Sequence, residues 1–242
     1  AHASARPSPL RDPLLRQTWE DVAFLHWSVD PSQVARRLPP GVEVDTFDGA
    51  AWVSLVPFQM RGIGLRRGPS VPYLGAFPET NVRTYVRGPD GAPGVWFDSL
   101  DATRLLPVAT ARLAYGLPYM WSAMTIDRSP GRIVYRARRR WPEHRGATSL
   151  VEVLVGAVAD PTDELADFLT SRWRLFSARG SGVWQAGVDH PAWPLRQGTV
   201  SRLDDEFVAA AGYDIGTRPP DVVHYAPGVP VLAGRPRRLP AQ

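Results

Sequence analysis

Apolar and polar residues alternate in short runs over most of the chain, and Gly, Pro and Asp separate the runs. This alternation predicts β-strands, because successive side chains of a strand point to opposite faces of the sheet. Asp48-Gly49 is a strong turn signal that predicts a hairpin between two of these runs. Strands are expected at residues 22–29, 42–47, 51–59, 80–86, 94–100, 119–127, 132–140 and 150–158, with further short strands towards the C-terminus.

Helical signals are few. Asp30-Pro31 and Asp160-Pro161 each combine an N-capping residue with a proline suited to the first helical turn. The segment 61–77 is rich in Gly and Pro and is expected to be a loop or a pocket rim. Helices are expected at 31–38, 104–115, 162–176 and, shorter, near 204–211.

Together these elements predict a strand-dominated α+β fold with a few flanking helices. A single domain is expected over residues 14–234, with loose tails at 1–13 and 235–242.

Composition narrows the chemistry. The 242 residues include no cysteine, and all 28 basic residues are arginine, so there is no lysine. The absence of cysteine excludes disulfides and thiolate catalysis, and the absence of lysine excludes a lysine Schiff base. Codon bias in a GC-rich genome is the simplest explanation for the missing lysine.

Charge and hydropathy indicate few partners. The net charge is +4, and the densest basic run places Arg136, Arg138 and Arg140 on one face of a predicted strand. A solvated strand face is expected there, because no nucleic-acid-binding motif accompanies the arginines. No run reaches the ~18 apolar residues of a membrane span, and residues 1–13 lack the apolar core of a signal peptide. We therefore expect a cytoplasmic protein with no nucleic-acid or membrane partner.

The strongest chemical signal is a polar strand face. Glu79, Asn81, Arg83 and Tyr85 alternate with β-branched residues and would share one side of a strand. If the sheet closes, this face forms the wall of a pocket; the alternative is a half-buried strand with its polar side in water. Glu79 and Arg83 would lie about 13 Å apart along the strand, so each needs another partner or a ligand. The next strand is expected to place Ser99 on one face with Phe97 and Asp101.

A short motif connects this strand to a known family. Gly116-Leu117-Pro118 is followed by Tyr119-Met120. The chain thereby resembles acetoacetate decarboxylases, whose Gly-x-Pro frame precedes a lysine pair that forms and activates a Schiff base. The resemblance implies that Glu79 corresponds to the pocket glutamate of those enzymes. Tyr119 and Met120 stand in place of the lysine pair.

A second resemblance covers nearly the whole chain, from about Thr18 to Leu232. It is to the uncharacterised DUF2071 or YqjF-like proteins of the same superfamily, and it implies an acetoacetate decarboxylase-like β-barrel or cone but no particular reaction. The stretches that carry it are 24–27, 48–53, 79–86, 95–102, 117–119, 168–172, 190–195 and 224–229.

Roles follow from residue chemistry. Glu79 is the expected general acid or base, since an apolar cavity would raise its pKa. Arg83 and Arg112 could clamp a carboxylate or enolate, and Tyr119 could donate to its oxygen. Each residue also has a structural alternative: a bonded carboxylate, a buried ion pair or a packed core tyrosine. The expected catalytic residues are Glu79, Tyr119 and Arg112, and the expected substrate-binding residues are Asn81, Arg83, Tyr85, Ser99, His26 and His190.

Motifs of other catalytic and cofactor-binding classes are absent from the sequence. The spacing of His26, His190 and His224 fits no zinc pattern, and there is no GxSxG, Walker A or GxGxxG motif, so neither a metal nor a cofactor is expected. The sequence favours an enzyme of lyase or cyclase type that acts on an oxo-acid, a β-dicarbonyl or a polyketide-like substrate without a Schiff base. Decarboxylation, dehydration, aldol chemistry and cyclisation all remain open. The alternative is a non-catalytic binding or accessory protein with the same pocket, and a homodimer remains a candidate assembly.

Overall fold

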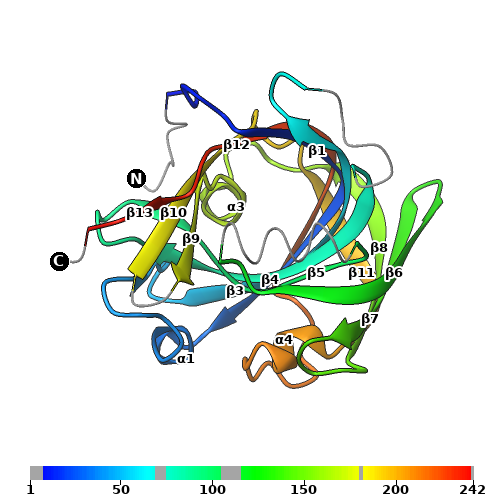
Figure 1. The fold of residues 1–242 in the computed structure, drawn as a ribbon. Coiled ribbons are helices and arrows are strands. Elements are labelled where there is room, and N and C mark those ends of the chain that lie inside the picture. The colour runs from blue at the N-terminus through cyan, green and yellow to red at the C-terminus, as the bar shows by residue number, and fades with distance from the viewer. Residues whose placement is uncertain (1–7, 69–74, 105–115, 180–181, 241–242) are drawn as a thin grey trace.

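A computed structural model describes residues 8–68, 75–104, 116–179 and 182–240. Figure 1 shows a strongly curved sheet with short helices on its two sides. The strands are β1 Leu15–Val29, β2 Glu43–Val44, β3 Ala51–Leu65, β4 Phe77–Arg87, β5 Pro93–Ala102, β6 Tyr119–Ser129, β7 Arg132–Trp141, β8 Thr148–Val158, β9 Arg174–Arg179, β10 Gly182–Asp189, β11 Arg196–Asp205, β12 Val222–Ala233 and β13 Arg237–Arg238. The helices are α1 Pro31–Ala35, α3 Glu164–Thr170 and α4 Phe207–Ala210. The predicted strand-dominated α+β architecture is confirmed.

The sheet closes on itself twice. Nine strands form one ring in the order β5-β6-β7-β8-β11-β12-β1-β3-β4, which the β4–β5 pairing closes. A second ring of seven strands runs β12-β10-β9-β5-β4-β3-β1, because β9 pairs with β5 and β10 pairs with β12. The two rings share five strands, β12, β1, β3, β4 and β5, which we call the shared sheet. Each of its two faces therefore looks into a different ring.

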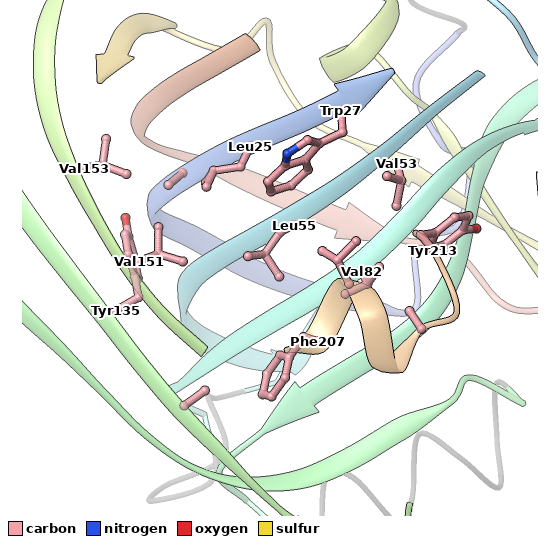
Figure 2. Close-up of a cluster of buried hydrophobic side chains, with 14 of the residues drawn as sticks. Leu25, Trp27, Val53, Leu55, Val82, Tyr135, Val151, Val153, Phe207 and Tyr213 are labelled. Atoms are coloured by element: carbon pink, nitrogen blue, oxygen red, sulfur yellow. The ribbon is translucent and has the colours of Figure 1, made fainter. Parts of the chain in front are cut away.

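The interior of the nine-strand ring is an apolar core. Leu25, Trp27, Val53, Leu55 and Val82 are all fully buried on the shared sheet. Figure 2 shows them opposite side chains of β7 and β8, with α4 closing one end. These β-branched and aromatic side chains suit a pleated, close-packed surface, so this face is the principal hydrophobic core.

Of the two predicted helix caps, Asp30 is confirmed and Asp160 is wrong, because Asp160 accepts the Thr162 N–H before α3 begins. The Asp30 carboxylate accepts the backbone N–H of Ser32, and Pro31 occupies the first turn of α1. The best helical pattern, 162–176, is shorter than predicted. α3 spans only Glu164–Thr170 with Asp163 as its N-cap, and β9 begins at Arg174. Pairing of β9 with β5 and β10 overrides the helical spacing, because each added strand satisfies a row of backbone groups.

Three further expectations differ from the structure. The turn between Phe47 and Ala50 forms, yet β2 pairs with β4 and not with β3, so the predicted hairpin is wrong. The expected loop at 61–77 is in part the end of β3, which continues to Leu65 and pairs with β1. Within the predicted loose C-terminal tail, β13 pairs with β10 and Leu239 is buried. The predicted helix at 104–115 lies almost wholly outside the described residues.

Candidate active site

The interior of the seven-strand ring is a pocket. Its volume is about 1080 Å³ including the open mouth, and every strand of that ring contributes to its lining. α3 packs against the same side of the shared sheet through Phe168 and Leu169, which contact Trp52, Tyr85 and Val95. The sheet thus has a close-packed face in one ring and a hollow face in the other.

Glu79 and Tyr119 meet in the pocket wall. The Tyr119 hydroxyl donates to Glu79 Oε2 over 3.2 Å, and the glutamate is only 3% exposed. Burial raises the pKa of Glu79 from 4.5 to about 8; the Tyr119 hydrogen bond opposes this shift and the charge of Asp101 adds to it. Among the described residues no arginine forms an ion pair with this carboxyl group. The sequence prediction that Glu79 and Tyr119 share one site therefore agrees with the geometry.

Two buried arginines lie farther along the pocket. Arg83 Nη2 donates to the Leu169 carbonyl over 3.1 Å, and Arg172 Nε donates to the Phe168 carbonyl over 2.7 Å. Both guanidinium groups lie against the ring of Tyr85, at 5.8 and 5.1 Å from its centroid. Both also line the pocket. The carbonyl end of α3 therefore gathers two cations at one place.

Tyr85 and His26 are not pocket-lining residues. Both are fully buried, and together with Ser54 they form a closed hydrogen-bond network. Ser54 Oγ lies 2.6 Å from His26 Nδ1 and 2.8 Å from the Tyr85 hydroxyl, which in turn donates to the Leu169 carbonyl over 2.8 Å. The expected substrate contacts from His26 and Tyr85 are therefore corrected, because neither side chain lines the pocket and the Tyr85 hydroxyl instead bonds the C-terminal end of α3.

His190 and Asn81 do line the pocket. The His190 ring lies between tryptophans, with centroid distances of 4.4 Å to Trp173 and 5.0 Å to Trp193. Burial lowers its pKa, and its Nδ1 lies 2.8 Å from the Pro191 carbonyl. The lowered pKa favours the neutral form of the His190 imidazole, which packs within an aromatic wall. Asn81 Oδ1 is buried without a hydrogen-bond partner in the described structure.

Ser99 lies on the opposite face of β5, and its expected place in the site is wrong. A bulge shifts the β4–β5 register, so that Val82 pairs with Ser99 while Arg83 pairs with Phe97. Phe97 therefore faces the pocket, whereas Ser99 faces the nine-strand ring. There Arg139 Nη2 donates to Ser99 Oγ over 3.2 Å and to Asp101 Oδ2 over 2.7 Å. No pattern in the sequence predicted this bulge.

Other outcomes concern residues that the sequence did not place well. Arg112, predicted as a catalytic cation, lies outside the described residues. Arg172 and the tryptophans Trp19 and Trp193 line the pocket but were not proposed for it. Arg172 follows Ser171, the C-cap of α3, whereas the sequence placed it inside a predicted helix over 162–176 and so gave no signal for it. Within the described ranges no three His, Cys, Asp or Glu side chains cluster to hold a metal, and no helix is long and apolar enough to cross a membrane.

The doubly closed sheet is that of acetoacetate decarboxylase-like proteins. An acetoacetate decarboxylase-like enzyme from Sphingomonas wittichii RW1 matches with a TM-score of 0.67 at 17% identity, over 99% of this chain and 100% of the other. Acetoacetate decarboxylase from Legionella pneumophila gives 0.67 at 13% identity, over 98% and 94% of the two chains. The enduracididine biosynthesis enzyme MppR, complexed with the condensation product of pyruvate and imidazole 4-carboxaldehyde, gives 0.66 at 17% identity, over 95% and 90%. These likenesses establish the fold.

Sequence comparison defines the family within that fold. Residues 16–230 match DUF2071, a family of uncharacterized conserved proteins. The uncharacterized protein YqjF of Bacillus subtilis (strain 168) is 32% identical over 219 residues, which is 90% of each chain. The chain therefore belongs to the DUF2071 family, as the sequence motifs predicted.

Proposed function

We propose that this protein is a small-molecule enzyme of lyase or cyclase type that works through an enolate without a Schiff base. Its substrate would be an oxo-acid, a β-dicarbonyl or a polyketide-like compound. The observation that carries the proposal is the Glu79–Tyr119 pair, a buried carboxyl group bonded to a phenol in a largely apolar pocket. Similarity in fold to acetoacetate decarboxylase and to MppR, which was solved with pyruvate bound, supports a carbonyl substrate.

Glu79 is the general acid. Because burial raises its pKa to about 8, the carboxyl group is protonated at neutral pH. Oε2 accepts the Tyr119 hydrogen bond, which leaves Oε1 to donate a proton to the carbonyl oxygen or the enolate carbon of a substrate. A positioned acid with a pKa near the working pH typically contributes about 10²–10⁴-fold to the rate.

Tyr119 supports the same step. When a substrate oxygen replaces Glu79 as the acceptor, the phenol donates to that oxygen and stabilises the negative charge of the enolate. Decarboxylation, dehydration, aldol cleavage and cyclisation share this intermediate. Loss of CO₂ forms it without a base, and in the other three reactions the ionised form of Glu79 takes the proton that its acid form later returns. The absence of lysine excludes the covalent route for each of them.

Enolisation can be tested before the natural substrate is known. In D₂O, the wild-type protein should exchange the protons next to the carbonyl of at least one member of a panel of acetoacetate, 2-oxobutyrate, acetylacetone and triacetate lactone, followed by NMR. Glu79→Gln should reduce this exchange about 10²–10⁴-fold, whereas Glu43→Gln, an exposed carboxylate on β2, should leave it unchanged. Removal of the α-proton needs the ionised carboxylate of Glu79, so the exchange rate of the wild type should rise as the pH rises through about 8, where Glu79 loses its proton. Undiminished exchange in the E79Q protein would remove Glu79 from this role.

The second candidate function is a binding protein that has kept the pocket. Tyr119-Met120, standing where the lysine pair of the decarboxylases would be, favours it. Ligand binding without any exchange over the whole panel would support the binding protein. Borohydride reduction in the presence of pyruvate should label no internal residue, and an internal adduct would contradict the non-covalent mechanism.

A further inference from the structure

The pocket contains a buried cation that no protein carboxylate neutralises. Arg83 is 7% exposed, and none of the ion pairs among the described residues includes it. Its single hydrogen bond is to the Leu169 carbonyl, and its Nε is buried without a partner in the described part of the chain. A guanidinium group removed from water without a counter-ion is costly, so an anion is the missing partner.

Arg172 does not relieve this excess of charge. Its Nη1 lies 2.6 Å from Asp45 Oδ2, while Asp45 Oδ1 already accepts Arg87 Nε over 3.0 Å. One carboxylate therefore serves two arginines, and none serves Arg83. Arg172 Nη2 is also buried without a partner among the described residues. Both arginines line the pocket, and guanidinium groups suit a planar anion such as a carboxylate.

This cationic place is distant from the acid. Glu79 and Arg83 are four residues apart on β4, and a strand rises about 3.3 Å per residue, so their Cα atoms are about 13 Å apart. The Arg83 guanidinium lies 5.6 Å from the ring centroid of Phe24 and 5.8 Å from that of Tyr85. An elongated compound spans this row of side chains more readily than a short keto acid does.

The surface between the two ends is mostly apolar. Cross-strand neighbours place Phe58 beside Glu79, Leu100 beside Asn81 and Phe97 beside Arg83, and all of them line the pocket. Asn81 Oδ1 is the one polar atom with an unused acceptor along this path in the described chain. An aliphatic or aromatic spacer fits such a wall, because burial of each methylene group is favourable.

We propose that Arg83 and Arg172 bind a terminal carboxylate of an elongated substrate whose reacting carbonyl group lies at Glu79 and Tyr119. This inference rests on the proposed function for the second end only; the carboxylate site stands on the unpaired arginines. Among the open substrate classes it selects long, monoanionic keto compounds over short keto acids.

A series of methyl-ketone carboxylates of increasing length tests the inference: acetoacetate, levulinate and 7-oxooctanoate. Binding can be followed by calorimetry or by the fluorescence of Trp19 and Trp193, which line the pocket. Affinity should rise by about four-fold for each additional buried methylene and be greatest for 7-oxooctanoate. Acetoacetate binding as tightly as 7-oxooctanoate would overturn the elongated substrate.

A purely apolar site would also bind longer ligands more tightly. The contribution of the carboxylate charge is therefore measured separately. The neutral 7-oxooctanamide should bind about 10–100-fold more weakly than the carboxylate to the wild-type protein. In Arg83→Gln this preference should largely disappear, and in Arg61→Gln, an exposed arginine paired with Glu20, it should be unchanged. Equal binding of amide and carboxylate to the wild type would overturn the anion site even where the R83Q protein does not fold.

The failure of this inference is separable from failure of the proposed function. Glu79→Gln should keep the preference for carboxylate over amide, because it leaves both arginines in place. Loss of isotope exchange with retained carboxylate preference supports both proposals. Retained exchange in E79Q, with an intact carboxylate preference, would remove the general acid and leave the anion site standing.

Discussion

The two faces of the shared sheet differ in whether a buried arginine beside them has a carboxylate partner. In the nine-strand ring, Arg139 Nε and Nη2 lie 2.8 and 2.7 Å from the two oxygens of Asp101, and both side chains are almost completely buried. In the seven-strand ring, Arg83 is almost as buried and has no carboxylate among the described residues. The first arrangement completes a core by itself. The second is complete only when something from outside supplies the charge.

The same difference extends to packing. Side chains of the nine-strand ring interdigitate around Leu55 and Val53, whereas the seven-strand ring encloses a pocket of about 1080 Å³ including its mouth. A close-packed interior stabilises the fold, and a hollow one with unpaired polar atoms reserves that stabilisation for a ligand. One sheet thus contributes a close-packed core on one face and borders an open pocket on the other.

Removing the guanidinium from the core should have the largest effect. Arg139→Met leaves the Asp101 carboxylate buried without its partner and should lower the free energy of unfolding by about 3–5 kcal/mol. Urea denaturation followed by circular dichroism measures it. A loss below about 1 kcal/mol would contradict the view that this pair belongs to the stabilising core.

Apolar truncations should separate the two faces next. Leu55→Ala in the core should cost about 2–5 kcal/mol, because it removes buried methyl groups and leaves a cavity. Leu117→Ala in the pocket wall should cost about 2 kcal/mol from transfer alone, since the removed atoms border the pocket and leave little new cavity. Equal losses in urea denaturation would mean that the pocket is packed as tightly as the core.

Above about pH 6, where Asp98 and Asp205 have lost their protons, the dependence of stability on pH should come from the hollow face. The folded protein keeps the Glu79 proton up to about pH 8, whereas the unfolded chain releases it near pH 4.5. Unfolding therefore releases a proton between these values, and the folded state loses stability as the pH rises, by about 1 kcal/mol per pH unit. Glu79→Gln should flatten this slope and Glu43→Gln should not. The same slope in wild type and E79Q would place the titration on another group.

The smallest effect should have the opposite sign. Arg83→Met removes an uncompensated buried cation and should raise the free energy of unfolding of the ligand-free protein by about 1 kcal/mol. The substitution is the same as at Arg139, so the two variants form a matched pair. A destabilisation of similar size at both positions, measured in the same denaturant series, would show that Arg83 stabilises the ligand-free fold as Arg139 does.

Much of the site was visible in the order of residues along β4. Strict alternation placed Glu79, Asn81 and Arg83 on one face, and the structure directs all three to the pocket. Tyr85, the next residue of that row, shares the face but lies beneath α3, because the helix covers this end of the strand. Alternation determines which face a residue occupies; it does not determine what covers that face.

The other differences have a similar origin. Ser99 changed sides because one bulge in β5 reverses the alternation beyond it. Arg172 lines the pocket because the helix predicted over 162–176 ends early. Residues 174–179 instead form β9, which pairs with β5 and β10. Pairing between strands far apart in the sequence depends on closure of the whole sheet, which local periodicity does not contain.

The sequence by itself determined the strand-dominated fold, the family and the exclusion of a lysine Schiff base, since these depend on residue type and local alternation. Only the tertiary structure decided that the sheet closes twice. Closure brought Tyr119 to Glu79 and placed Arg172 and Arg83 around the ring of Tyr85. Among the described residues it left Arg83 without a carboxylate partner. Burial, and with it the raised pKa of Glu79 and the need of Arg83 for an anion, is a property of the assembled ring, because it depends on the solvent that distant segments exclude together.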